Sequence, residues 1–123
     1  MTELVRVPVV LVVEDHGDTR AMYAQVLELF GYVTHQARDG FEAWTKANEL
    51  LPDVIVTDYR LPGINGAAFI KRFRGTHPDV RAMVISAYTD ATTIDEATDA
   101  GATFMAKPLD FELLEHWVRG SSA

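Results

Sequence analysis

The sequence predicts an α/β fold in which a doubly wound, five-stranded parallel sheet lies between two layers of helices, five in all. Five short apolar runs alternate strictly with amphipathic stretches of helical periodicity. Three of these runs are almost continuous in aliphatic residues, which is typical of strands buried on both faces. The chain has 123 residues, 48% of them hydrophobic, enough to fill the core of one domain.

The predicted strands are, in chain order, Val9–Val13, Val33–Gln36, Val54–Thr57, Ala82–Ile85 and Thr103–Ala106. The second and fifth runs are the most polar, so we expect them at the two edges of the sheet. Every connection runs from strand to helix to strand, so the crossovers should be right-handed.

Helical spacing of apolar residues predicts the first three helices. The first has Met22, Val26, Leu27, Leu29 and Phe30 at that spacing, and Gly31 is placed to end it in a left-handed conformation. The second covers Phe41–Leu50, with Ala43, Ala47 and Leu50 on one face, and the third covers Ala67–Phe73. Pro52 and Gly75 should mark their ends.

The last two helices differ in strength. Asp90–Ala100 has three threonines and only Ile94 as a large apolar anchor, so we expect it to be mobile. The final helix should be capped by Asp110, and its expected buried stripe is Leu113, Leu114, Trp117 and Val118. We predict a single domain over 1–123, with an ordered core of about 7–119 and residues 120–123 as a tail or the start of a linker.

Composition excludes several classes of function. There are 11 Lys and Arg against 18 Asp and Glu, a formal net charge of −7, which argues against direct binding of nucleic acid. The chain has no cysteine, so thiolate metal sites and disulfides are excluded. The longest apolar run, Val7–Val13, is far shorter than the roughly 20 residues of a membrane span, and we do not expect a secretory signal. We therefore expect a cytoplasmic protein without a membrane partner.

Polar residues follow four of the predicted strands. They are Glu14 and Asp15 after the first, Asp58 after the third, Ser86 after the fourth and Lys107 after the fifth. The carboxyl ends of parallel strands meet at one sheet edge, where ligands of such folds bind. Three clustered carboxylates need a hard cation, and Mg²⁺ suits this few oxygen donors while leaving positions for a phosphoryl group. Lysine and serine would then act as donors to that group, and Asp58 is the candidate nucleophile.

Each of these residues also has a simpler interpretation when taken alone. Asp15 or Asp18 could cap the next helix, Asp58 could be a turn residue, and Lys107 before Pro108 could be a solvated charge at a strand end. Their joint placement at one sheet edge favours the functional interpretation. His16 is adjacent to the acidic pair and could tune cation affinity.

Four segments resemble the receiver domain of two-component response regulators. These are Val9–Asp15 (VVLVVED), Val54–Gly66 (VIVTDYRLPGING), Ser86–Tyr88 (SAY) and Ala100–Pro108 (AGATFMAKP). The resemblance covers essentially the whole chain. It implies a flavodoxin-like, CheY-like fold with strand order 2-1-3-4-5.

The resemblance implies that Asp58 accepts a phosphoryl group from a phosphohistidine of a sensor histidine kinase or phosphotransfer protein. Mg²⁺ would be held by Asp15 and Asp58, by Glu14 through water and by the backbone carbonyl of Arg60. Lys107 would pair with the phosphoryl oxygens, and Ser86 would turn inward to form hydrogen bonds with them.

The resemblance further implies a switch, with Ser86 moving together with the aromatic residue Phe104. Many relatives have threonine at the position of Ser86 and tyrosine at the position of Phe104. The movements of these two residues should therefore be less tightly coupled here. The Asp90–Ala100 helix, the Thr103–Ala106 strand and the Asp110 helix would form the face that contacts an output domain or effector protein. The formation of a homodimer on phosphorylation is an alternative that the sequence leaves open. No enzymatic activity is expected beyond the chain's own phosphorylation and dephosphorylation.

Three other classes of protein share some of these features. A haloacid-dehalogenase-type phosphatase would have its nucleophile in a paired-aspartate motif on the first strand, where this sequence has Glu14 and Asp15. A nucleotide or flavin binder would need a phosphate-cradling loop there, rather than acidic residues. A receiver-like interaction domain that is never phosphorylated stays open.

Overall fold

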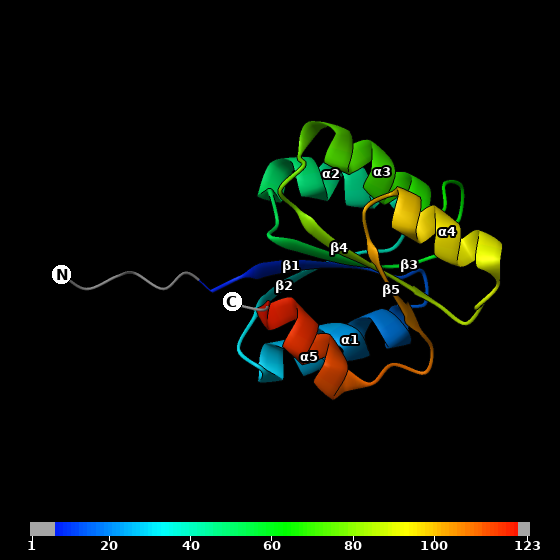
Figure 1. Ribbon diagram of the computed structural model, residues 1–123. Coiled ribbons are helices and arrows are strands. Elements are labelled where there is room, and N and C mark those ends of the chain that lie inside the picture. Colours follow the sequence, from blue (N-terminus) through cyan, green and yellow to red (C-terminus); the bar gives the residue numbers. More distant parts are fainter. Residues whose placement is uncertain (1–6, 121–123) are drawn as a thin grey trace.

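The chain folds into a five-stranded parallel sheet with helices on both faces, as the sequence predicts (Figure 1). The computed structural model describes residues 7–120, so residues 1–6 and most of the predicted tail, 121–123, lie outside the described residues. The strands are β1 (Val9–Val13), β2 (Val33–Ala37), β3 (Val54–Asp58), β4 (Arg81–Ser86) and β5 (Thr103–Ala106). Their order is β2-β1-β3-β4-β5, which places the two polar strands at the edges.

Helices α2, α3 and α4 cover one face of the sheet, and α1 and α5 cover the other (Figure 1). Their bounds are α1 (Gly17–Leu29), α2 (Gly40–Leu50), α3 (Gly66–Thr76), α4 (Ala91–Asp99) and α5 (Phe111–Arg119). No helix in the described part of the chain is long and apolar enough to cross a membrane.

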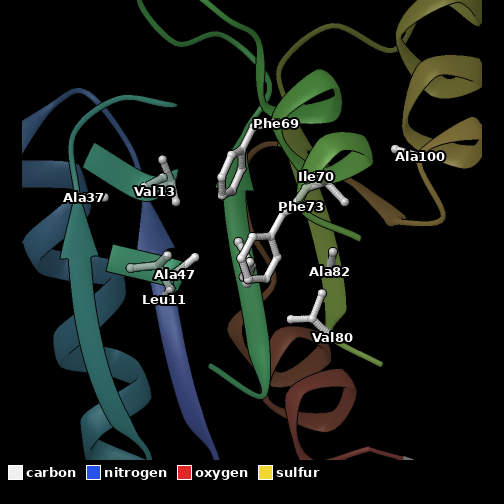
Figure 2. Close-up of a cluster of buried hydrophobic side chains, with 12 residues drawn as sticks. Leu11, Val13, Ala37, Ala47, Phe69, Ile70, Phe73, Val80, Ala82 and Ala100 are labelled. Atoms are coloured by element: carbon white, nitrogen blue, oxygen red, sulfur yellow. The ribbon is translucent and has the colours of Figure 1, made fainter. Parts of the chain in front are cut away.

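Alternate residues of the central strands face opposite layers, so the sheet contributes to two cores. Leu11, Val13 and Ile55 pack with Phe69 and Phe73 of α3 on one side (Figure 2). Val10, Val12 and Val56 pack with buried residues of α1 and α5 on the other. Burial on both faces explains the continuous aliphatic runs of β1, β3 and β4.

The predicted caps are present where the sequence places them. Gly31 has φ +98° immediately after the end of α1, and only glycine adopts that backbone conformation without strain. The Asp110 carboxylate accepts hydrogen bonds from the backbone N–H groups of Glu112 and Leu113. Asp90, which the sequence predicts as the first residue of the fourth helix, instead precedes α4 and caps it by accepting from Thr93 N–H.

Three local predictions were wrong. Leu113 is 57% exposed and does not belong to the buried stripe of α5, whose buried residues are Leu114 and Val118. Leu50 is 36% exposed, so the buried face of α2 is made by Ala43 and Ala47. Gly75 lies inside α3, which continues to Thr76, because an exposed glycine near a helix end costs only about 1 kcal/mol.

Candidate phosphoryl-acceptor and metal site

The five polar residues predicted at the strand ends lie together at the carboxyl edge of the sheet. Asp58 and Ser86 are the last residues of β3 and β4, Glu14 and Asp15 follow β1, and Lys107 follows β5. A pocket of about 270 Å³ opens there; it is lined by Asp15, His16, Asp58, Arg60, Ser86, Ala87, Tyr88 and Lys107. Parallel strands bring their ends to one edge, so the topology itself assembles this pocket.

Glu14 is fully buried, and both its backbone N–H and its backbone carbonyl are hydrogen bonded. Its N–H donates to Ala37 O of β2 at 3.0 Å, and Arg20 of α1 donates from Nη1 to Glu14 O at 2.9 Å. Glu14 Oε1 accepts from the His16 N–H at 3.2 Å. Glu14 Oε2 is buried and accepts no hydrogen bond from the described residues. A buried carboxylate oxygen without a donor is costly, so this atom suits a cation or a water bound to one.

Asp58 is 8% exposed at the end of β3. Lys107 Nζ lies 3.1 Å from Asp58 Oδ1 and 3.8 Å from Glu14 Oε2, so one ammonium group faces two buried carboxylates. Burial, and then repulsion by Glu14, raise the pKa of Asp58 to about 6, although Lys107 opposes the rise. The site therefore carries more negative charge than its single lysine balances.

The loop after Asp58 is fixed by backbone hydrogen bonds. Tyr59 N–H donates to Ile85 O of β4, and Gly66 N–H donates to Tyr59 O, both at 2.8 Å. A Cβ added at Gly66 would collide with the carbonyl oxygen of Asp58, so only glycine permits this close approach. The Gly66 in the predicted motif thus has a structural role in placing the phosphoacceptor candidate.

Ser86 and Lys107 are held beside each other. Lys107 N–H donates to Ser86 O at 2.9 Å, which continues the pairing of β4 and β5 past the strand ends. The Ser86 side chain is buried, and its Oγ accepts from Tyr88 N–H at 2.9 Å. Its hydroxyl proton is therefore available to donate to another acceptor.

The acidic pair does not serve as a helix cap. The residue before α1 is His16, and its side chain makes no capping hydrogen bond. Donor atoms of Glu14, Asp15 and His16 all lie within 4.8 Å of one another, a grouping that could hold a metal ion. Asp58 lines the same pocket as Asp15 and His16. The carboxylates of Glu14, Asp15 and Asp58 are oxygen donors of the kind that a divalent cation such as Mg²⁺ binds. Among the described residues, the buried Oε2 of Glu14 has no hydrogen-bond donor that a cation would have to displace.

Sequence reasoning missed several contacts around the pocket. Arg60 Nη1 donates to Tyr88 Oη at 2.6 Å, and the guanidinium lies 5.2 Å from the centre of the Tyr88 ring. Tyr59 Oη donates to Glu96 of α4, 3.1 Å from either carboxylate oxygen. These side chains come from loops and from the weakest predicted helix, where no periodicity indicates which residues meet.

Phe104 of β5 is half-buried. It packs against a small cluster formed by Ala67, Val84 and Ala97. This cluster joins α3, β4 and α4, so Phe104 lies between the sheet edge and the helix that the sequence identifies as weak.

The parallel sheet and the acidic, serine and lysine side chains at its strand ends define a doubly wound α/β domain with a ligand-binding edge as the class of protein. The family model of the response regulator receiver domain matches residues 10–119. The chain therefore belongs to the response regulator receiver family, whose members act in two-component phosphorelay signalling.

Individual proteins agree with this assignment. The chain is 30% identical over 111 residues to sporulation initiation phosphotransferase F of Bacillus subtilis. The matched region covers 89% of this chain and 90% of that protein. The chain is 36% identical over 101 residues to chemotaxis protein CheY of Thermotoga maritima, with coverage of 80% and 84%. The crystal structure of CheY4 of Vibrio cholerae superposes with a TM-score of 0.82 at 30% identity, covering 89% of this chain and 93% of that one.

Four other relatives are much longer proteins, of which the chain spans 13% to 28%. They are a cyclic di-GMP phosphodiesterase, a sensor kinase, a regulatory protein and a transcriptional regulatory protein. Receiver domains are thus found both in chains of this size and as parts of larger proteins.

Proposed function

We propose that this domain is a phosphorylation-dependent switch in which Asp58 accepts a phosphoryl group from a phosphohistidine of a histidine kinase or phosphotransfer protein. The observation that supports it is the pairing of a buried aspartate with a lysine in an open pocket that also has acidic residues and a serine. An Asp58 carboxylate oxygen would attack phosphorus in line, forming an acyl phosphate while the P–N bond breaks and the histidine ring leaves.

The residues of the pocket have distinct proposed roles. Glu14, Asp15, Asp58 and the Arg60 carbonyl would hold Mg²⁺, which when bound neutralises charge on the phosphoryl oxygens. Lys107 would exchange its contact with Asp58 for one with a phosphoryl oxygen, and Ser86 Oγ–H would donate to another. Water attack on the acyl phosphate would reset the switch, so the chemistry stays confined to the chain's own phosphorylation and dephosphorylation.

The output is proposed to pass through the face formed by α4, β5 and α5. Tyr59 follows the phosphoacceptor directly and is hydrogen bonded to Glu96 of α4, so a shift of the loop after Asp58 reaches α4 through one contact. Phe104 packs on the same helix through Ala97 and provides a second connection. A few contacts suffice, because a tenfold change in population needs only about 1.4 kcal/mol.

The direct test is intact-mass spectrometry after incubation with Mg²⁺ and acetyl phosphate. Wild type should gain a single, hydroxylamine-labile phosphoryl adduct, and Asp58→Asn should gain none. Asp95→Asn, which makes the same substitution at an exposed position on α4, should label like wild type. Equal labelling of Asp58→Asn would contradict the assignment, and an unlabelled wild type would favour a receiver-like interaction domain.

A further inference from the structure

The candidate metal site includes a nitrogen donor from the residue that precedes α1. His16 Nδ1 lies 3.1 Å from Glu14 Oε1 and 3.3 Å from Asp15 Oδ1. The His16 side chain is 78% exposed, so its ring lies at the solvent side of the pocket that Asp58 and Asp15 also line.

The distances between these donors match those around a single metal ion. Two ligands bound at about 2.1 Å and at a right angle to each other are about 3.0 Å apart. The two His16 distances, 3.1 and 3.3 Å, are close to that separation. The contact between His16 Nδ1 and Glu14 Oε1 is also a hydrogen bond, so a cation bound between them would replace that hydrogen bond.

A second observation points to a ligand at this position. Glu14 is fully buried, and its Oε2 accepts no hydrogen bond from the described residues. Its other oxygen already accepts from the His16 N–H, and Lys107 Nζ is too far from Oε2, at 3.8 Å, for a hydrogen bond. Among the described residues, Glu14 Oε2 therefore has an ion pair with Lys107 but no hydrogen-bond donor, and a bound cation would complete its contacts.

We propose that His16 is a direct metal ligand, which makes the site a mixed imidazole and carboxylate site. This inference rests on the proposed function, because it concerns the metal that serves Asp58. Imidazole binds Mn²⁺, Co²⁺ and Ni²⁺ in preference to Mg²⁺, which takes oxygen ligands. The site should therefore bind these transition metals more tightly than an all-oxygen site would.

The opposite role for His16 is a hydrogen-bond donor that takes the place of a cation between Glu14 and Asp15. In that case the ring competes with any metal, and removing it should strengthen binding of Mg²⁺ and Ni²⁺ alike. The two roles predict opposite effects of one substitution. Asn suits the position before a helix, and the His16 side chain makes no capping hydrogen bond, so His16→Asn should fold normally.

The test combines electron spin echo spectroscopy of bound Mn²⁺ with calorimetric titration of Mg²⁺ and Ni²⁺. Wild type should show modulation from a directly bound imidazole ¹⁴N, and His16→Asn should lose it. The same substitution should weaken Ni²⁺ binding about tenfold or more while changing Mg²⁺ binding much less. His116→Asn removes an exposed histidine on α5 and should match wild type in both measurements.

The remaining outcomes overturn the inference in distinguishable ways. Bound Mn²⁺ without nitrogen modulation, or tighter binding of both metals by His16→Asn, refutes a ligand role for His16. Either result leaves phosphorylation of Asp58 intact if acetyl phosphate still labels the protein. Failure to bind any of the three cations, together with no labelling, would overturn the proposed function as well.

Discussion

Replacing Asp58 by asparagine should stabilise the metal-free protein at neutral and alkaline pH. Burial and repulsion by Glu14 raise the Asp58 pKa from 3.8 to about 6, so the ionised carboxylate is disfavoured in the folded state. The difference between these two pKa values corresponds to about 3 kcal/mol. Asparagine has no such charge but loses the contact with Lys107, so the expected gain in unfolding free energy is about 1–3 kcal/mol at pH 8.

The gain should depend on pH with a definite sign. Between about pH 4 and pH 6 the folded state binds the Asp58 proton more tightly than the unfolded chain does, so wild-type stability falls as pH rises through this window. Above pH 6 the penalty is complete, and near pH 4 it is largely absent. The advantage of Asp58→Asn should therefore be large at pH 8 and well under 1 kcal/mol at pH 4.

Urea unfolding, followed by tryptophan fluorescence with EDTA present, measures this difference. Asp95→Asn, at an exposed position on α4, is the matched control and should differ little from wild type at either pH. A destabilised Asp58→Asn, or an equal gain at pH 4 and pH 8, would refute the reasoning. Saturating Mg²⁺ should narrow the gap at pH 8, because it stabilises the wild type by mass action.

Two other substitutions test the positioning of Asp58. Lys107→Ala removes the ammonium that faces Asp58 and Glu14, and should lower the unfolding free energy by about 1–3 kcal/mol at pH 8. It should retain some labelling by acetyl phosphate but lose the amide chemical-shift changes that accompany labelling; shift changes as large as those of phosphorylated wild type would contradict the role of Lys107. Gly66→Ala places a Cβ against the Asp58 carbonyl and should cost about 1–3 kcal/mol in urea unfolding, whereas Gly75→Ala, at an open helical position, should be neutral or stabilising.

The fold was predictable because its signals are local and repeated. Aliphatic runs and helical stripes identified all five strands and five helices, and the polarity of β2 and β5 correctly placed them at the edges. The exposure of Leu113 was not predictable from its helical spacing, because α5 contacts the sheet over a narrow stripe centred on Leu114 and Val118. The width of a buried stripe depends on the partner surface, which a single helix does not encode.

The candidate site was predictable to the extent that topology alone assembles it. Glu14, Asp58, Ser86 and Lys107 each follow or end a strand, and parallel strands bring those positions together. The Arg60–Tyr88 and Tyr59–Glu96 hydrogen bonds depend on the paths of loops, which carry no periodic pattern. The lack of a hydrogen-bond donor to Glu14 Oε2 among the described residues was likewise not predictable, because burial of one oxygen is set by neighbours from several elements.

Instability of the metal-free site and its proposed affinity for a cation have the same physical origin. Glu14, Asp15 and Asp58 carry three negative charges and Lys107 one positive charge, so the formal sum is −3 + 1 = −2 before a divalent ion binds. Burial, and then repulsion by Glu14, raise the Asp58 pKa by disfavouring the ionised carboxylate, and a bound cation would offset that cost. Asp58→Asn should thus weaken divalent-metal binding while it stabilises the metal-free fold, and calorimetry on the variant used for urea unfolding measures both effects. An Asp58→Asn variant that gained stability but bound Mg²⁺ as tightly as wild type would contradict a common origin of the instability and the metal affinity.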